Sequence, residues 1–338
     1  MNSCINQHYV PQFYLRYFSN NKKNIGMFRF KNNLYVDNAS IKSIAYKKNL
    51  YGEDGKIEQL LSISENDWNK TIKKFINLDF DKINNIDYKN LLQFITVSDA
   101  RSNKLANEQI VLASTLKKLF NGFDDNEYFK SIKIMEQLPN LLPITIAYQN
   151  IDYISDLSMI ILINKTVHKF ITSDNIVAKY NQLYKYRKYP LNFGLGSSGL
   201  QIFIALSPEI VICLYDGLAY KCVFADGIIR LNDKKIINAI NKLMIHNADE
   251  AIFYNGIDEN KIRTLVKGKK HMKPEDSVGI FEEEGGDGLL IHTHSVNVKE
   301  HIEFNIFKIT EEYMKISFPK HAGGLVRPHC KKIDKLKR

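Results

Sequence analysis

The chain carries two kinds of hydrophobic pattern, one helical and one typical of β-strands. Apolar residues recur on one side of a helix over residues 57–76, and a similar stripe repeats over 88–120, a length that predicts a bend. Between 159 and 215, short β-branched runs are bounded by Asp-Asn, glycine or Ser-Pro turns. We therefore predict an α+β fold in which N-terminal helices pack on a mostly antiparallel central sheet.

Shorter patterns complete this outline. Residues 25–30 and 34–36 are expected to form a hairpin. Asn232-Asp233 is expected to cap a core-facing helix that runs from 234 to about 253. Strands of the central sheet are expected at 159–163, 169–172, 200–206 and 211–215.

The domain organisation follows from length and from a change in composition near the C-terminus. A chain of 338 residues with 44% apolar content can bury a large core. Residues 1–258 are expected to form the main domain, and 259–274, basic and poor in apolar residues, to form a linker. Residues 275–338 are then a small C-terminal unit, either α+β or β.

The segment from His8 to Phe18, HYVPQFYLRYF, is the densest aromatic stretch of the chain. Pro11 fits the first position of a short helix, where its missing N–H costs nothing. Apolar side chains would then point in nearly every direction, which predicts a buried helix that carries Arg16 inward. A buried guanidinium must be paired, so we expect a carboxylate or a bound anion to meet it.

The same segment resembles the hallmark of a bacterial family, the domain of unknown function 4238. Further motifs follow in the order expected for that family: Asn49-Leu50-Tyr51-Gly52, a helix with Glu58 and Glu65, Arg101 in a second helix, Phe170 to Asn175, and Leu206-Ser207-Pro208. One position differs, because this chain has Ile176 where the family usually has proline. The resemblance runs from about Gln7 to about Gly256. It implies a cytoplasmic bacterial protein without a settled activity, and similar members are often discussed beside phage-defence or toxin genes.

Charge and composition restrict the location and the partners. The net charge of +10 favours nucleic acid or a nucleotide as a partner. Only eight of the 47 basic residues are arginine, however, and codon bias in a genome of low GC content also produces such a lysine-rich chain. The sequence has no apolar run near eighteen residues and no signal-peptide pattern, which favours the cytoplasm and no membrane contact. Its four scattered cysteines predict neither disulfides nor a zinc ribbon.

Ionisable residues at positions where packing prefers carbon are the candidate site. Glu58, Glu65 and Asp174 offer the hard oxygen ligands that Mg²⁺ or Mn²⁺ prefers. The predicted roles are catalysis by His8, Glu65 and Asp174, with His8 moving a proton, and phosphate binding by Arg16, Arg101 and Asn175. This set predicts a metal-dependent nuclease or phosphoryl hydrolase that acts as a phage-defence or toxin effector.

Two other interpretations fit the same residues. In a purely structural one, Arg16 pairs with Glu65 and Arg101 pairs with Glu58 inside the helical layer, while Ser173 to Asn175 cap their own turn. In the other, the two arginines grip a nucleotide or another anionic ligand without catalysis, and the C-terminal unit contacts a protein partner.

Three further motifs carry less specific chemistry. His292 and His294 alternate on a predicted strand and would share a metal with His301, His321, His329 or Cys330, although a solvated histidine pair is the simpler interpretation. The glycines at 194–199 lead into a strand, so we expect a turn or loop rather than a phosphate cradle. Tyrosines among the lysines of 179–188 would stack bases or form a solvated loop.

Overall fold

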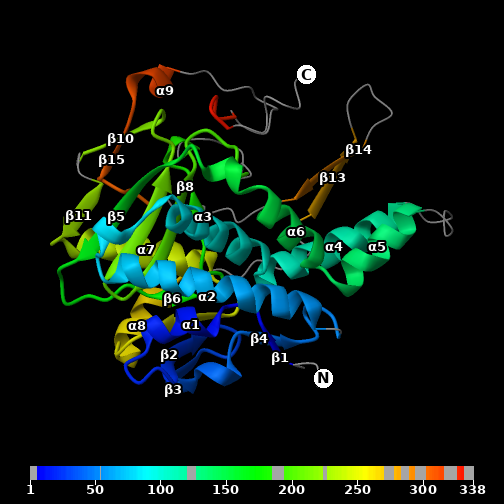
Figure 1. Ribbon diagram of the computed structural model, residues 1–338, viewed down its shortest axis with the longest axis horizontal. Helices are drawn as coiled ribbons and strands as arrows, with labels where there is room; N and C mark the ends of the chain where they lie inside the picture. The colour runs from blue at the N-terminus through cyan, green and yellow to red at the C-terminus, as the bar shows by residue number, and fades with distance from the viewer. Residues whose placement is uncertain are drawn as a thin grey trace.

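The computed structural model describes residues 6–53, 55–119, 127–184, 194–223, 227–269, 278–282, 289–293, 302–315 and 326–330. Helices and two main β-sheets build this part of the chain (Figure 1), which confirms the predicted α+β class. Within the described residues no helix is long and apolar enough to cross a membrane. The cytoplasmic location stays a prediction.

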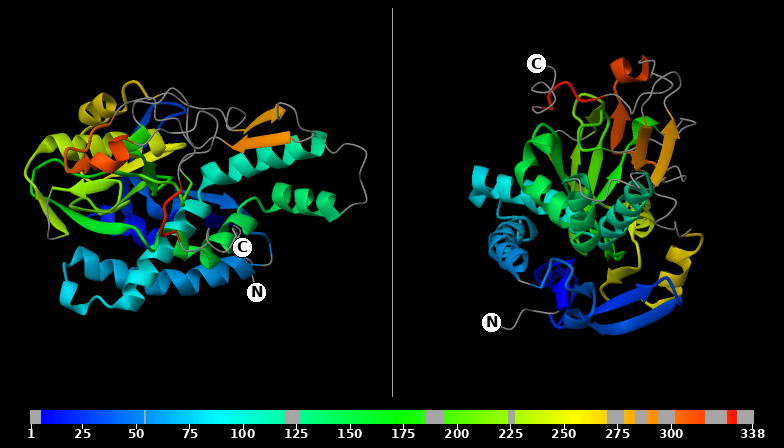
Figure 2. Two further views of the ribbon diagram at one scale, coloured as in Figure 1. Left: turned by 90° about the horizontal axis from the view of Figure 1, so that it is seen from above. Right: turned by 90° about the vertical axis from the view of Figure 1, so that its right-hand side faces the viewer.

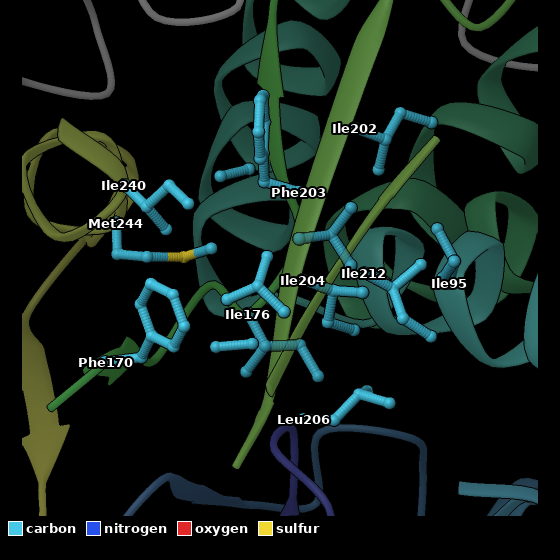
Figure 3. Close-up of a cluster of buried hydrophobic side chains, with 14 of the residues drawn as sticks. Ile95, Phe170, Ile176, Ile202, Phe203, Ile204, Leu206, Ile212, Ile240 and Met244 are labelled. Carbon is cyan, nitrogen blue, oxygen red and sulfur yellow. The ribbon is translucent and has the colours of Figure 1, made fainter. Parts of the chain in front are cut away.

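A five-stranded sheet forms the centre of the molecule. Its strand order is β11 (Ile228–Leu231), β5 (Ser158–Asn164), β9 (Ile210–Tyr215), β8 (Gln201–Ser207) and β7 (Ala178–Tyr180). Only β11 and β5 run parallel, so the predicted mostly antiparallel sheet is confirmed. Every residue of β8 is buried, because helices cover both faces of the sheet. Figure 3 shows β8 between Ile95 on one side and Ile240 and Met244 on the other.

A four-stranded antiparallel sheet lies beside the first one. Its order is β3 (Leu34–Ser40), β2 (Asn24–Arg29), β12 (Ala251–Tyr254) and β6 (Thr172–Ser173). The predicted hairpin is β2 and β3. Residues 169–172 were expected in the central sheet, but β6 belongs to this second sheet. A Cβ at Gly26 would lie 2.4 Å from the Tyr254 ring, so β2 and β12 approach closely only because this residue is glycine.

The helix expected from 234 to about 253 is shorter than predicted. Helix α7 (Lys234–Asn247) ends six residues earlier, and its apolar continuation, Ala251–Tyr254, is strand β12. The prediction was wrong because an apolar run of this length fits either structure. Pairing with both β2 and β6 decides in favour of the strand.

The helical layer contains α2 (Lys56–Ile76), α3 (Asn85–Ala100), α4 (Asn103–Leu119), α5 (Glu127–Gln137) and α6 (Leu141–Gln149). The predicted helix at 57–76 is α2. The bend expected within 88–120 is a complete break between α3 and α4 at Arg101 and Ser102. Helices α4 and α5 pack side by side and extend away from the sheets (Figures 1 and 2).

The N-terminal motif ties the two sheets together. Strand β1 (Asn6–His8) pairs with β4 (Tyr46–Lys48), and the short helix α1 (Gln12–Leu15) follows Pro11. The buried Tyr14 hydroxyl donates to the Ala205 carbonyl of β8 at 2.6 Å and lies 2.6 Å from the Thr172 hydroxyl of β6. One side chain of the motif therefore bonds to both sheets.

Residues after 258 are joined to the main body in the parts that the structure describes. Within the expected linker 259–274, residues Glu259–Val266 form helix α8, whose Ile262 is fully buried. Strand β15 (Phe307–Ile309) pairs with β10 (Tyr220–Cys222), and the Phe304 ring stacks on Phe203 at 4.5 Å. Residues 302–315, which end in helix α9 (Glu311–Lys315), thus share the main core. The expected unit 275–338 also includes β13 (Val278–Glu282) and β14 (Leu289–Thr293).

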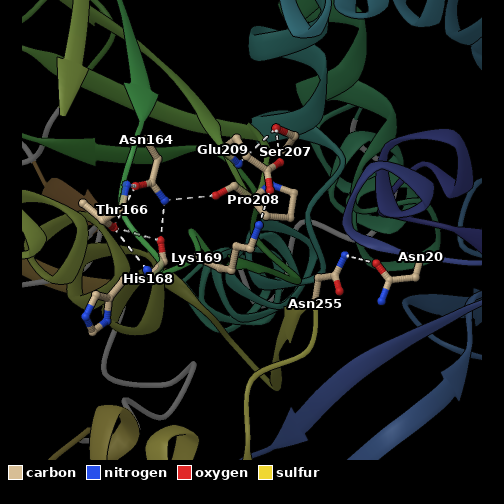
Figure 4. A network of polar contacts seen from close by, with 9 residues as sticks. All are labelled: Asn20, Asn164, Thr166, His168, Lys169, Ser207, Pro208, Glu209 and Asn255. Carbon is tan, nitrogen blue, oxygen red and sulfur yellow. Dashed lines mark hydrogen bonds and ion pairs between the residues drawn. The ribbon is translucent and has the colours of Figure 1, made fainter. Parts of the chain in front are cut away.

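Two of the loops beside central strands are held by side-chain hydrogen bonds. The Asn164 amide bonds to Thr166 and to the carbonyls of His168 and Pro208, which fixes the β5–β6 connection against the β8–β9 turn (Figure 4). The glycine-rich segment 194–199 is an ordered turn rather than a phosphate cradle. Its Gly199 has a φ of +74° and donates its N–H to Asp216 at 2.8 Å.

The Tyr14 bridge predicts a stability effect. Tyr14→Phe removes the hydroxyl and with it the bonds to the Ala205 carbonyl and the Thr172 hydroxyl, so we expect the free energy of unfolding to fall by about 1–3 kcal/mol. Urea unfolding measures this change. Tyr46→Phe is the control, because no hydrogen bond of its hydroxyl is found among the described residues, and equal losses in both variants would contradict the bridge.

Candidate functional site

Arg101 is the buried arginine of the helical layer. Its side chain is 1% exposed and lies where α3 ends and α4 has not yet begun. Its Nε donates to the Tyr51 hydroxyl at 3.1 Å, one terminal nitrogen donates to Glu65 at 2.6 Å, and the other donates to the His8 carbonyl. Each of the three nitrogens bonds within the protein and the side chain is buried, so Arg101 is not open to a phosphate from solvent.

Arg16 does not share this position. Its side chain is exposed, and its guanidinium bonds only to the Gln12 side chain, at 3.3 Å, among the described residues. The expectation that α1 carries Arg16 inward is wrong, because residues 12 and 16 are four apart and form one polar stripe on an otherwise buried segment. The predicted pairing is also changed: Glu65 bonds to Arg101 rather than to Arg16.

His8 and Glu58 flank the Arg101–Glu65 pair. The Nε2 atom of His8 and the Oε2 atom of Glu58 are buried, and neither has a hydrogen-bond partner in the described part of the chain. Burial lowers the pKa of His8, and burial raises the pKa of Glu58, so both side chains favour their neutral forms. We name His8, Tyr51, Glu58, Glu65 and Arg101 the Arg101 cluster.

Asp174 lies in different surroundings from Glu58 and Glu65. It is 2% exposed and accepts the backbone N–H groups of Asp249 at 2.8 Å, Glu250 at 2.6 Å and Ala251 at 3.1 Å. It therefore caps the turn between α7 and β12 rather than a turn of its own.

Asn175 and the predicted metal site fit this structural picture. The Asn175 amide bonds to the Asn247 carbonyl and side chain at 3.4 and 3.2 Å. Glu58 and Glu65 face Arg101, whereas Asp174 faces Asp249, so the three carboxylates do not converge. Within the described residues no group of three His, Cys, Asp or Glu side chains is placed to hold a metal ion.

A second polar cluster surrounds Asp174, and sequence reasoning missed most of it. Lys179 of β7 pairs with Asp99 of α3 at 2.7 Å. The Asn103 amide donates to Asp249 at 2.7 Å. We name the Asp174 cluster by its nine members: Asp99, Asn103, Lys104, Glu108, Asp174, Lys179, Asp249, Glu250 and Lys269.

Burial shifts several pKa values of this cluster in the direction that favours the uncharged form of each side chain. It raises the pKa of Asp174 to about 7, helped by the Asp249 carboxylate, and it lowers the pKa of Lys269 to about 8. Burial also lowers the pKa of Lys104 and raises that of Glu108. Perturbed values of this kind gather at functional sites, although ion-pair networks produce them too.

Lys104 and Glu108 are the pair without a bonded partner. They stand one turn apart on α4, both half-buried, and neither lies within hydrogen-bond or ion-pair distance of another side chain among the described residues. The paired Asp99 and Lys179 and the carboxylate of Asp249 surround them. The i, i+4 spacing on a predicted helix is the sequence signal that could have identified this pair.

The two clusters lie on opposite sides of the α3–α4 break. Arg101 points into the first cluster, and Asn103 points into the second. The N-terminal motif divides in the same way, because His8 adjoins Arg101 while Tyr9 adjoins Asp174 and Asp249. The break and the motif therefore organise both clusters.

The second predicted metal site falls mostly outside the described residues. His294, His301 and His321 lie there, and of His292 only the backbone of β14 is described. His329 is exposed and Cys330 is buried. Residues 185–188 of the basic, tyrosine-rich stretch 179–188 also lie outside the described residues.

The comparisons with known proteins agree with the resemblance of the His8–Phe18 motif. The sequence profile of the domain of unknown function 4238 family (DUF4238), described as a protein of unknown function, matches residues 6–257. This chain belongs to that family. Searches of curated proteins and of solved structures find no match. Lys269, in the second cluster, lies outside the matched residues.

The two arginines provide a matched stability test. We expect Arg101→Met to lower the free energy of unfolding by about 3 kcal/mol or more, because it leaves the Glu65 carboxylate without its cation and removes one of the donors to the His8 carbonyl. Arg16→Met is expected to change it by less than about 0.5 kcal/mol. Chemical denaturation measures both variants, and a larger loss in Arg16→Met would show that the assignment is wrong.

Asp174 predicts a dependence of stability on pH. Its pKa in the folded state is about 7, above its ordinary value, so the folded protein disfavours the ionised form. This side chain therefore lowers the free energy of unfolding as pH rises from its ordinary pKa of 3.8 to about 7, and the loss is relieved as pH falls through the same range. Free energies of unfolding from urea titrations of the wild type and Asp174→Asn should diverge between about pH 4 and about pH 7. Parallel curves would contradict the assignment.

Proposed function

We propose that the protein hydrolyses phosphodiester or phosphoanhydride bonds of a nucleic acid or nucleotide, with the Asp174 cluster as its active site. The observation that carries the proposal is the half-buried pair of Lys104 and Glu108, without bonded partners among the described residues and with pKa values moved toward neutrality. A carboxylate whose pKa is raised by burial is a stronger base than an ordinary carboxylate, which suits it to acid–base catalysis. The net charge of +10 supports an anionic substrate.

The proposed roles follow from charge and position. Glu108 takes a proton from the attacking water as its oxygen bonds to phosphorus. Lys104 and Lys179 stabilise the negative charge that grows on the phosphoryl oxygens. The bond to the leaving oxygen then breaks, and that oxygen takes a proton from solvent. Asp99 and Asn103 position the site through Lys179 and Asp249.

This assignment replaces the arginine-based site expected from sequence. Arg101 is buried and bonded within the protein and Arg16 lies on the exterior, so lysines take the role of phosphate binding. Since the described carboxylates do not form a three-ligand group, no proposed step uses Mg²⁺ or Mn²⁺. A dependence on either ion is part of the experiment below.

The biological role that we propose is that of a cytoplasmic toxin or phage-defence effector. It is supported by the family resemblance of the N-terminal motif and by the basic charge. A protein partner that contacts residues 275–338 also stays a prediction.

The test is hydrolysis by purified protein. RNA, DNA and a panel of nucleotides are incubated with Mg²⁺ or Mn²⁺ and, in parallel, with EDTA. Glu108→Gln and Lys104→Met are each expected to reduce kcat by about a hundredfold or more, because they remove the base and a charge-stabilising cation. Lys118→Met and Glu312→Gln, both exposed, are the matched controls and should keep full activity.

Two outcomes would oppose the proposal. Hydrolysis that survives both Glu108→Gln and Lys104→Met places the chemistry elsewhere. Saturable nucleotide binding without turnover, seen as a melting temperature that rises with nucleotide concentration, would favour the non-catalytic sensing module instead.

A further inference from the structure

Lys269 reaches the Asp174 cluster from beyond the family-matched residues. Its Nζ donates to the Ile245 carbonyl at 2.8 Å and to the Ala248 carbonyl, and lies 3.9 Å from the centroid of the Phe30 ring. Both carbonyls belong to the C-terminal end of α7, where the helix dipole favours a cation. The side chain is therefore anchored rather than free in solvent.

The same turn is held on its other side by Asp174. The lysine meets the last carbonyls of α7, and the aspartate accepts the next three N–H groups, those of residues 249–251. The turn is thus clamped between the half-buried Lys269 and the buried Asp174. It carries Asp249, whose carboxylate bonds to Asn103 at the start of α4.

We propose that Lys269 is a positioning residue of this site, which holds the α7–β12 turn from its carbonyl side so that Asp249 stays opposite Lys104. Lys269 acts through the turn and has no role in contacting substrate. The expected effect of Lys269 on catalysis rests on the proposed function. Its expected effect on the titration of Asp174 rests only on the contacts that Lys269 and Asp174 make with the turn.

The charges around Lys269 determine the direction in which it changes the pKa of Asp174. Asp174 and Asp249 face Lys269 from β6 and the turn, and Lys104 faces it from α4. Tyr9 and Glu250 lie close to the two aspartates. Without the lysine, the buried Asp174 would keep its repulsion from Asp249 and lose its cation, so its ionised form would become less favourable.

The first measurement is the titration of Asp174 by carboxyl ¹³C NMR, assigned with Asp174→Asn. Lys269→Met should raise the pKa of Asp174, and Lys269→Arg should leave it near the wild-type value. Lys269→Gln keeps a donor for the carbonyls without the charge, so it should behave like Lys269→Met if charge is decisive. Lys118→Met, an exposed lysine of α4, is the control and should change nothing.

The second measurement is steady-state hydrolysis. In Lys269→Met we expect kcat to fall by between about tenfold and a hundredfold with KM little changed, because Asp249 is no longer held opposite Lys104. Lys269→Arg should restore kcat.

The two measurements separate the inference from the proposed function. Absence of hydrolysis in the wild type would overturn the proposed function alone, and NMR would still decide on the clamp. An unchanged Asp174 titration in folded Lys269→Met and Lys269→Gln overturns the inference, as does an unchanged kcat in an active enzyme.

Discussion

The buried guanidinium of Arg101 is the constraint on which the rest of the structure depends. A cation removed from water must be paired and hydrogen-bonded, and this one is satisfied by Glu65 from α2, Tyr51 from the loop before it, and the His8 carbonyl from β1. Arg101 is the residue at which α3 ends, so its side chain reaches these partners from the break between α3 and α4. Helix α4 therefore starts in a new direction and carries Lys104 to the opposite side.

Strand pairing brings together the second set of charges. Asp174 directly follows β6 and Asp249 precedes β12, and these strands are neighbours in the same sheet. Residues some seventy-five positions apart in sequence thereby meet at one sheet edge, where Asp174 satisfies the N–H groups of the incoming turn. Low exposure then moves the pKa values of the gathered groups, so the chemistry of the cluster is a product of the packing.

Local patterns predicted the elements whose burial is periodic. Helix α2, the hairpin of β2 and β3, and the central strands β5, β8 and β9 all follow from spacing alone. The candidate site was predicted from the sequence only in part. His8, Glu58, Glu65 and Arg101 do meet, yet Arg16 lies outside and Asp174 belongs to another cluster, because the direction of a side chain on a one-turn helix is set by its packing.

The sequence by itself determined the family, the α+β class and which stretches are apolar enough to be buried, since these depend on composition and on contacts along one element. Only the tertiary structure decided which charges meet. Residues 251–254 became a strand because β2 and β6 flank them, and Lys269 joined the cluster because α7 ends beside it. Such partners are chosen by long-range pairing and by the need to satisfy buried polar groups, and neither leaves a periodic trace in the sequence.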